Sequence, residues 1–128
     1  MSGPASLYMD YLTREGYRPS QNGNNLIVFK EEGRMYLIVV DAEDQAYFQL
    51  LFPNFWSIDD GSAFAKAVLA ASDATRMTKV AKVYVRDDGK DVTAAIEVFF
   101  DRPQDFAPVF RRSLAAIKSA VKTFVEKM

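Results

Sequence analysis

The residues of this chain that could carry acid–base or metal chemistry are carboxylates, because the sequence contains neither His nor Cys. Without these two types there is no imidazole base, no thiolate nucleophile and no Cys- or His-based metal site. Adjacent acidic pairs occur at Glu31-Glu32, Asp59-Asp60 and Asp87-Asp88. Each pair falls where a turn or a helix N-cap is expected, and those roles account for acidic residues. The pairs therefore do not indicate a catalytic site.

Other motifs of catalysis and ligand binding are also missing from the sequence. It has no D-x-D-x-D-G calcium loop, no Walker loop and no G-x-G-x-x-G. A serine nucleophile would need a lysine base, but Ser113 with Lys118, or Ser119 with Lys122, has the spacing of neighbours on a helix surface. We therefore predict that the protein is not an enzyme, that it has no catalytic, metal-binding or cofactor-binding residues, and that it uses no cofactor.

Charge is distributed unevenly along the chain, although the net charge is only -1. Residues 1–64 hold 4 basic and 9 acidic residues, whereas residues 65–128 hold 12 and 8. The two halves of one compact domain could complement each other, or the acidic half could offer a face to a partner. Both alternatives remain open at this point.

Apolar residues recur at helical spacing in three segments. Residues 6–15 form the first predicted helix, with Ser6 as its N-cap and Gly16 as the left-handed residue that ends it. The second begins at the Asp59-Asp60 pair and runs to about Thr75, and the third runs from about Pro103 to the C-terminus. The apolar faces predicted for these helices are Leu7, Tyr8, Tyr11 and Leu12; Phe64, Ala67, Val68 and Ala71; and Phe106, Phe110, Leu114, Ile117, Val121 and Phe124.

Five runs of β-forming residues accompany these helices. They cover residues 26–30, 35–40, 46–52, 79–86 and 92–100, with Pro53 ending the third, whereas residues 19–25 are predicted to form a turn. The order αβββαββα indicates an α+β fold with an antiparallel sheet, in a single domain over residues 1–128. We expect a cytoplasmic protein without a membrane span, because apolar runs are short and no signal peptide is recognisable.

The first predicted hairpin is apolar on both faces. A two-residue loop at Glu32-Gly33 pairs Phe29 with Tyr36 and the flanking residues in order. Helices on both sides of the sheet would bury both faces, whereas a dimer or client surface would leave one face for a partner. Both alternatives stay open. The face that forms the candidate interface consists of Leu26, Val28, Met35, Leu37 and Val39.

The second predicted hairpin alternates between apolar and polar residues, as a half-buried sheet does. A two-residue loop at Asp88-Gly89 pairs Val85 with Val92 and places Arg86 opposite Asp91. Basic residues beside a strand tyrosine could bind nucleic-acid bases, but facing carboxylates and a net charge near zero argue against it. We expect no nucleic-acid partner, and instead a cross-strand ion pair between Arg86 and Asp91.

Phe55 and Trp56 follow Pro53 at the junction between the third strand and the second helix. Aromatic residues in such a connection either cover the edge of the core or form a recognition pocket. Both alternatives remain open, so Phe55 and Trp56, the sole tryptophan, join the candidate interface.

Three segments carry a resemblance to a known family: residues 11–19 (YLTREGYRP), 27–36 (IVFKEEGRMY) and 78–85 (TKVAKVYV). They are similar to the YbjN-like domain, and the resemblance covers nearly the whole chain. Members of this family are described as bacterial sensory-transduction regulators. The resemblance implies a fold like that of type III secretion chaperones, with the order αβββαββα. Those chaperones are typically small acidic homodimers, whereas this chain is close to neutral.

The resemblance and the residues together predict a non-enzymatic protein that binds other proteins, as a regulatory or chaperone-like module. Its partner would be another protein or a second copy of the chain, at the candidate interface. The alternative is a small-ligand sensor domain with an aromatic pocket near Trp56.

Overall fold

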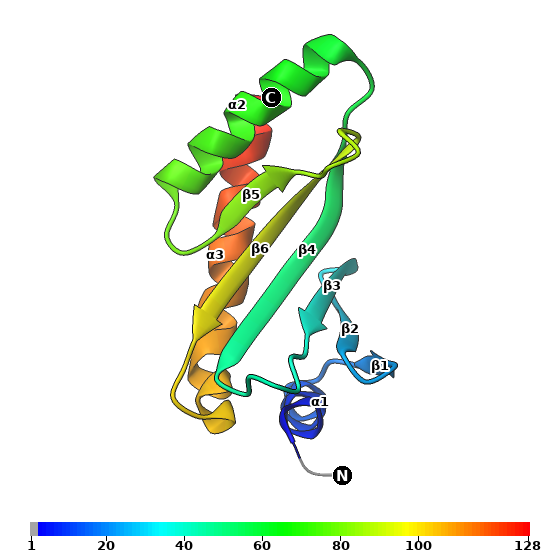
Figure 1. Cartoon of the computed structure of the whole chain (residues 1–128), viewed down its shortest axis with the longest axis vertical. Coiled ribbons are helices and arrows are strands. Elements are labelled where there is room, and N and C mark those ends of the chain that lie inside the picture. Colours follow the sequence, from blue (N-terminus) through cyan, green and yellow to red (C-terminus); the bar gives the residue numbers. More distant parts are fainter. Residues whose placement is uncertain (1–2) are drawn as a thin grey trace.

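An antiparallel sheet of six strands organises the molecule, in the order β1-β2-β3-β4-β6-β5 (Figure 1). The computed structural model describes residues 3–128, and within them three α-helices accompany the sheet. The α+β class and the order of the predicted elements are confirmed, with one further short strand. The helices are α1 (Pro4–Arg14), α2 (Gly61–Met77) and α3 (Phe106–Lys127), with a 3₁₀ turn η1 (Pro103–Asp105) before α3, and the strands are β1 (Ser20–Asn22), β2 (Leu26–Glu31), β3 (Arg34–Val39), β4 (Tyr47–Ser57), β5 (Lys82–Val85) and β6 (Asp91–Phe99).

The additional strand is β1, in a segment that the sequence predicted as turn. Ser20 pairs with Val28 and Asn22 with Leu26, at the edge of the sheet. All three β1 residues are polar and exposed. Backbone hydrogen bonds alone hold such a strand, so no side-chain periodicity indicates it.

The hairpin β2–β3 has the predicted register. Phe29 pairs with Tyr36 and the ladder closes at Glu31 and Arg34. Both loop residues have positive φ, 53° at Glu32 and 76° at Gly33. That combination is a type I′ turn, whose twist matches the twist of the flanking strands.

The hairpin β5–β6 keeps the predicted pairing of Val85 with Val92, but its loop is longer than predicted. The Gly89 N–H donates to the Arg86 carbonyl at 2.8 Å and closes a turn over residues 87 and 88. The predicted ion pair between Arg86 and Asp91 is wrong. The Arg86 guanidinium instead donates to Asn54 Oδ1 at 3.1 Å, because the neighbouring strand β4 brings that amide within reach.

Strand β4 does not end at Pro53, which corrects the sequence prediction. It continues to Ser57, and its pairing with β6 shifts register between Phe52 and Trp56. Asn54 lies in this bulge with φ 52°, and its N–H donates to Thr93 Oγ1 at 3.2 Å. A bulge already interrupts the ladder, so proline, which lacks an N–H, is tolerated there.

The helix ends differ in part from the prediction. Gly3 rather than Ser6 is the N-cap of α1, because Pro4 already has the φ of the first helical position. Gly16 ends α1 as predicted, with φ 95° and the Tyr17 N–H donating to the Leu12 carbonyl. None of the helices in residues 3–128 is long and apolar enough to span a bilayer.

Helix α2 begins as predicted but buries a different face. The Asp60 carboxylate caps it by accepting from the Ala63 N–H at 2.8 Å. Phe64 and Val68, predicted to be buried, are each 43% exposed. Alanine lets a helix approach its neighbours closely, and α2 packs against both α3 and β5. The buried face consists of Ala67, Ala70, Ala71 and Ala74.

The core lies between one face of the sheet and helices α1 and α3. The Phe48 ring of β4 lies 5.2 Å from Phe106 of α3 and 6.1 Å from Tyr8 of α1. Phe29 of β2 is 5.6 Å from Phe110 of α3. These rings are buried, and the aromatic contacts fix α1 and α3 against the same sheet face, which we call the inner face.

Candidate protein-binding surface

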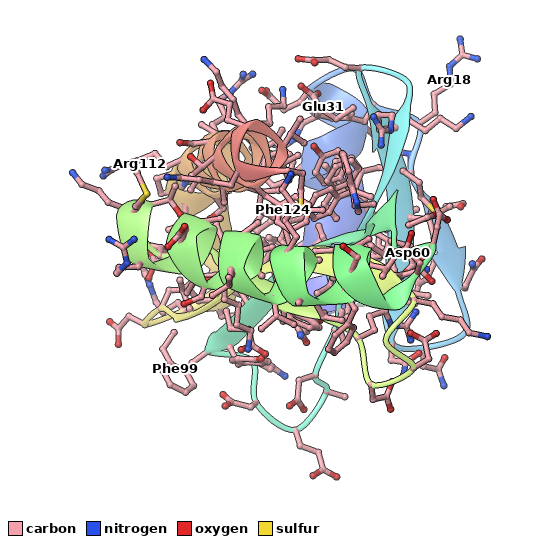
Figure 2. The ribbon with its side chains drawn as sticks, turned by 90° about the horizontal axis from the view of Figure 1, so that it is seen from above. Arg18, Glu31, Asp60, Phe99, Arg112 and Phe124 are labelled. Carbon is pink, nitrogen blue, oxygen red and sulfur yellow. The ribbon has the colours of Figure 1, made fainter. Side chains whose placement is uncertain are left out.

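The other face of the sheet, which we call the open face, carries no helix within residues 3–128 (Figure 2). Away from their turn, over residues 26–29 of β2 and 36–39 of β3, buried and partly exposed residues alternate. Ile27 and Ile38 are fully buried on the inner face, whereas their neighbours Val28 and Leu37 are only half-buried. Of the two alternatives that the sequence left open, burial of both faces by helices of the described chain is wrong.

Six apolar residues form a continuous patch on the open face. Val28 pairs with Leu37, and Leu37 in turn pairs with Leu51 on β4. Leu26 pairs with Val39 in the next row, and Met35, at the turn end of β3, is 51% exposed. The open-face patch thus consists of Leu26, Val28, Met35, Leu37, Val39 and Leu51.

The structure brings five predicted interface residues together and adds one that the sequence analysis missed. Leu51 joins them because β4 lies beside β3 in antiparallel register. Leu50 points into the core, so its neighbour Leu51 points to the other face of the sheet, and this much can be read from the sequence of β4 alone. The pairing with β3 could not be read from the sequence, because a long connection, unlike a two-residue loop, leaves register open.

Phe55 and Trp56 do not belong to this patch. The Phe55 ring stacks on Phe52 at 5.6 Å and meets Phe124 of α3 edge-on at 5.4 Å. Trp56 also contacts Phe124, with ring centroids 5.6 Å apart. Both residues therefore cover the edge of the core at the C-terminal end of α3. The open-face patch and the Trp56 region are separate surfaces.

Beside the patch, the open face of β4, β5 and β6 carries a polar network around Glu97. Tyr47 donates its hydroxyl to Glu97 at 2.7 Å, the Gln49 amide donates at 3.1 Å, and Lys82 forms an ion pair with the same carboxylate. Hydrogen bonds from Lys82 and then Tyr47 lower the pKa of Glu97. Burial, and then the bond to Glu97, raises the pKa of Tyr47. The Glu97 carboxylate is thus held in its charged form and the Tyr47 hydroxyl in its neutral form, which suits a structural network rather than proton transfer.

An acidic loop lies where β3 and β4 meet at one end of the open face. We define it by Asp41, Glu43 and Asp44, all of them exposed. Asp41 accepts a hydrogen bond from the Glu43 N–H and Asp44 from the Ala46 N–H, which shapes the loop. None of the three carboxylates forms an ion pair with any residue between 3 and 128. Their charge is thus not neutralised within the described chain.

A second polar network joins α3 to the hairpin β2–β3. Lys118 of α3 forms ion pairs with Glu31 and Glu32, and the Tyr17 hydroxyl donates to Glu31 at 2.7 Å. Burial raises the pKa of Glu31, but the hydrogen bonds from Lys118 and Tyr17 outweigh it and the net shift is downward. Burial and the bond to Glu31 raise the pKa of Tyr17 to about 12. This network holds the hairpin against the core.

Two shallow hollows mark the surface, and Tyr17 and the patch residue Val28 line the second of them. One, of about 540 Å³, follows α1 and is lined by Ser6, Asp10 and Arg14 among others. The other, of about 370 Å³, lies where the chain leaves Gly16 and is lined by Arg18 and Lys30. Trp56 lines neither hollow. Within residues 3–128, no three acidic side chains come close enough to share a metal ion.

Comparison with known proteins rests on the fold, since neither a protein-family model nor a curated protein matches the sequence. YbjN from E. coli, described as a proposed transcription regulator, superposes with a TM-score of 0.66 at 12% identity, over 98% of this chain and 94% of that one. The chain has a YbjN-like fold. An uncharacterized protein from Methanothermobacter thermautotrophicus gives a TM-score of 0.59 at 10% identity, with the same coverage. The YbjN-like fold that the sequence indicated is thereby confirmed.

Proposed function

We propose that this chain is a non-enzymatic regulatory or chaperone-like module, a single domain over residues 1–128, that binds a protein through the open-face patch. The observation that carries this proposal is the apolar patch of six residues on a sheet face without a covering helix. Met35 is exposed and the other five residues are partly exposed, and a contiguous apolar surface that remains in contact with water is a mark of an interaction site.

The inner face shows how much a sheet face of this kind gains by being covered. Apolar surface removed from water contributes roughly 25 cal/mol per Å². Along β2 and β3 the inner apolar side chains Ile27, Phe29, Tyr36 and Ile38 are buried in the core, whereas the patch on the other face is only partly buried. A partner that covers the patch would gain this free energy on binding.

The chemistry of the polar groups supports a binding role. Asp60 caps α2, Glu31 and Glu97 sit in ion-pair networks, and Asp41 and Asp44 shape a loop. Each carboxylate with a resolved pKa shift is stabilised in its charged form, opposite to the shift expected of a general acid. The description of YbjN as a proposed transcription regulator favours a regulatory role.

The occupant of the patch is a second copy of the chain or another protein, and one pair of variants tests both. Leu37→Asp places a charge at the centre of the patch, whereas Leu69→Asp places one on α2, where Leu69 is 68% exposed. Light scattering on the wild type and both variants measures self-association. Affinity capture with mass spectrometry, followed by binding of the purified candidate, measures association with another protein.

We expect the wild type to form a dimer or capture a defined partner, Leu37→Asp to abolish that complex, and Leu69→Asp to leave it intact. A charge buried without a partner costs several kcal/mol, enough to dissociate a micromolar complex. Wild-type protein that stays monomeric and captures nothing sensitive to Leu37→Asp would contradict the proposal. Loss of the complex in Leu69→Asp alone would move the interface to α2.

A further inference from the structure

The open-face patch does not end in neutral surroundings. Val39 is its last residue on β3, and the acidic loop follows directly. In Figure 2 the connection between β3 and β4 projects away from α3, on the same side of the sheet as Phe99. Phe99 is 77% exposed, and its ring lies 5.7 Å from that of Tyr47, at the start of β4. The apolar patch, the exposed Phe99 ring beside Tyr47, and the unpaired carboxylates of the acidic loop therefore lie on one side of the sheet.

Helix α3 shows what kind of element such a surface accepts. It packs Phe110, Leu114 and Ile117 on the inner face of this same sheet. Its basic side chains Arg111 and Lys118 form ion pairs with carboxylates beside that face. A basic amphipathic helix thus already covers one side of the sheet, and helix on sheet is a common way to bury an apolar sheet face.

We propose that the open-face patch docks a basic amphipathic helix of a partner protein, with its apolar side on the patch and basic residues against Asp41, Glu43 and Asp44. This inference rests on the proposed function and names the chemistry of the partner. Strands of six residues are about 20 Å long, a distance that a helix covers in roughly 13 residues. The expected element is therefore three to four turns long.

The charge of the acidic loop determines which charge the partner carries there, and the apolar area of the patch provides the affinity. The acidic loop contributes three negative charges without ion-pair partners in the described chain, so it attracts Lys or Arg and repels Asp or Glu. At the turn end of the patch the charge is reversed, since Lys30 faces Met35 across the hairpin and Arg18 lines a hollow with Val28. The basic residues of the partner helix therefore belong at the end that meets the loop. The exposed Phe99 ring can also receive a cation. A partner helix with acidic residues at this position would be repelled by the acidic loop.

The test uses two fluorescent helical peptides of matched sequence. In one, Leu recurs at i, i+3, i+4 and i+7 and Lys fills the positions beside this stripe, where it can reach the acidic loop; in the other, Glu replaces every Lys. Anisotropy is measured with the wild-type chain, with Leu37→Asp, with the control Leu69→Asp, and with a triple variant. The triple variant, Asp41→Asn, Glu43→Gln and Asp44→Asn, removes three charges but keeps the oxygens that accept the loop hydrogen bonds.

We expect the Lys peptide to bind the wild type and Leu69→Asp alike, and Leu37→Asp to weaken it by more than tenfold. The triple variant should bind it about tenfold more weakly at low salt, since each exposed charge contributes modestly. High salt should remove the difference between the wild type and the triple variant. The Glu peptide should not bind.

The outcomes separate this inference from the proposed function. If both peptides bind equally and Leu37→Asp abolishes both, the open face binds proteins but the charge preference is wrong. If the triple variant binds the Lys peptide like the wild type at low salt, the inference is overturned. Binding of neither peptide overturns it as well, and the proposed function then depends on the capture experiment alone. Binding lost only in Leu69→Asp overturns both.

Discussion

The two hairpins of the sheet share an inner face and differ on the open one. On β2–β3 the open side is apolar, with Val28 and Leu37 at its centre. On β5–β6 it carries Lys82 and Tyr84 instead, with Glu97 paired to Lys82. Both hairpins already contribute their inner sides to the core, so packing of the core does not explain why only the open side of β2–β3 is apolar. This difference between the open sides is what places the proposed binding surface on β2–β3.

The largest expected effect separates the two faces of β3. Ile38 is fully buried, so Ile38→Ala should lower the free energy of unfolding by about 2–5 kcal/mol. Leu37→Ala, one residue away on the open face, should lower it by only about 1 kcal/mol, because the Leu37 side chain is only partly buried. Urea unfolding of both variants measures this. Equal losses would show that the open face is part of the core.

The next effect concerns the edge of β5. Thr75 of α2 closes that edge, since its hydroxyl accepts from the Val83 N–H at 2.8 Å and donates to the Val83 carbonyl at 3.2 Å. Thr75→Val leaves both groups unpaired and should cost about 1–3 kcal/mol. Thr13→Val is the control, because Thr13 donates only to a carbonyl of its own helix at an exposed position. Thermal or urea unfolding that shows equal stability for the two variants would contradict this account of the edge.

The two turns provide a third comparison. Gly33 and Gly89 have φ of 76° and 72°, where a side chain is strained, so either substitution by Ala should cost about 1–2 kcal/mol. A Cβ on Gly33 would meet open space, whereas one on Gly89 would lie 3.4 Å from the Phe64 ring. Gly89→Ala should therefore be slightly the more destabilising of the two in urea unfolding. A clearly larger loss in Gly33→Ala would contradict this geometry.

The smallest effect is pH dependence, and it tests the network that holds β2–β3. The folded pKa of Glu31 lies below its ordinary value of 4.5, so Glu31 stabilises the fold above that pH. This stabilisation should be lost as pH falls through the lower folded pKa. Glu31→Gln removes the titration, so its urea midpoint should fall less than that of the wild type between neutral pH and about pH 3. Equal falls in both proteins would place the acid sensitivity elsewhere, Glu97 being the next candidate.

Much of the sheet could be predicted because short loops determine register. The Glu32-Gly33 turn fixed the pairing of β2 with β3, and with it the common face of five patch residues. The predicted pairing of β5 with β6 is also confirmed. Their loop is longer than predicted, but it takes the same number of residues from each strand, so the register does not change. The side chains of β1 gave no pattern, and the position of Pro53 suggested a strand end where there is a bulge.

The sequence by itself determined the order of every element except β1, the absence of His and Cys chemistry and the doubly apolar character of residues 26–39. Only the tertiary structure decided which apolar face is covered. It placed Phe55 and Trp56 against Phe124, added Leu51 to the patch and left the acidic loop beside it. The physical reason is range: turn geometry and periodicity act over a few residues, whereas coverage of a face depends on helices that lie far away along the chain.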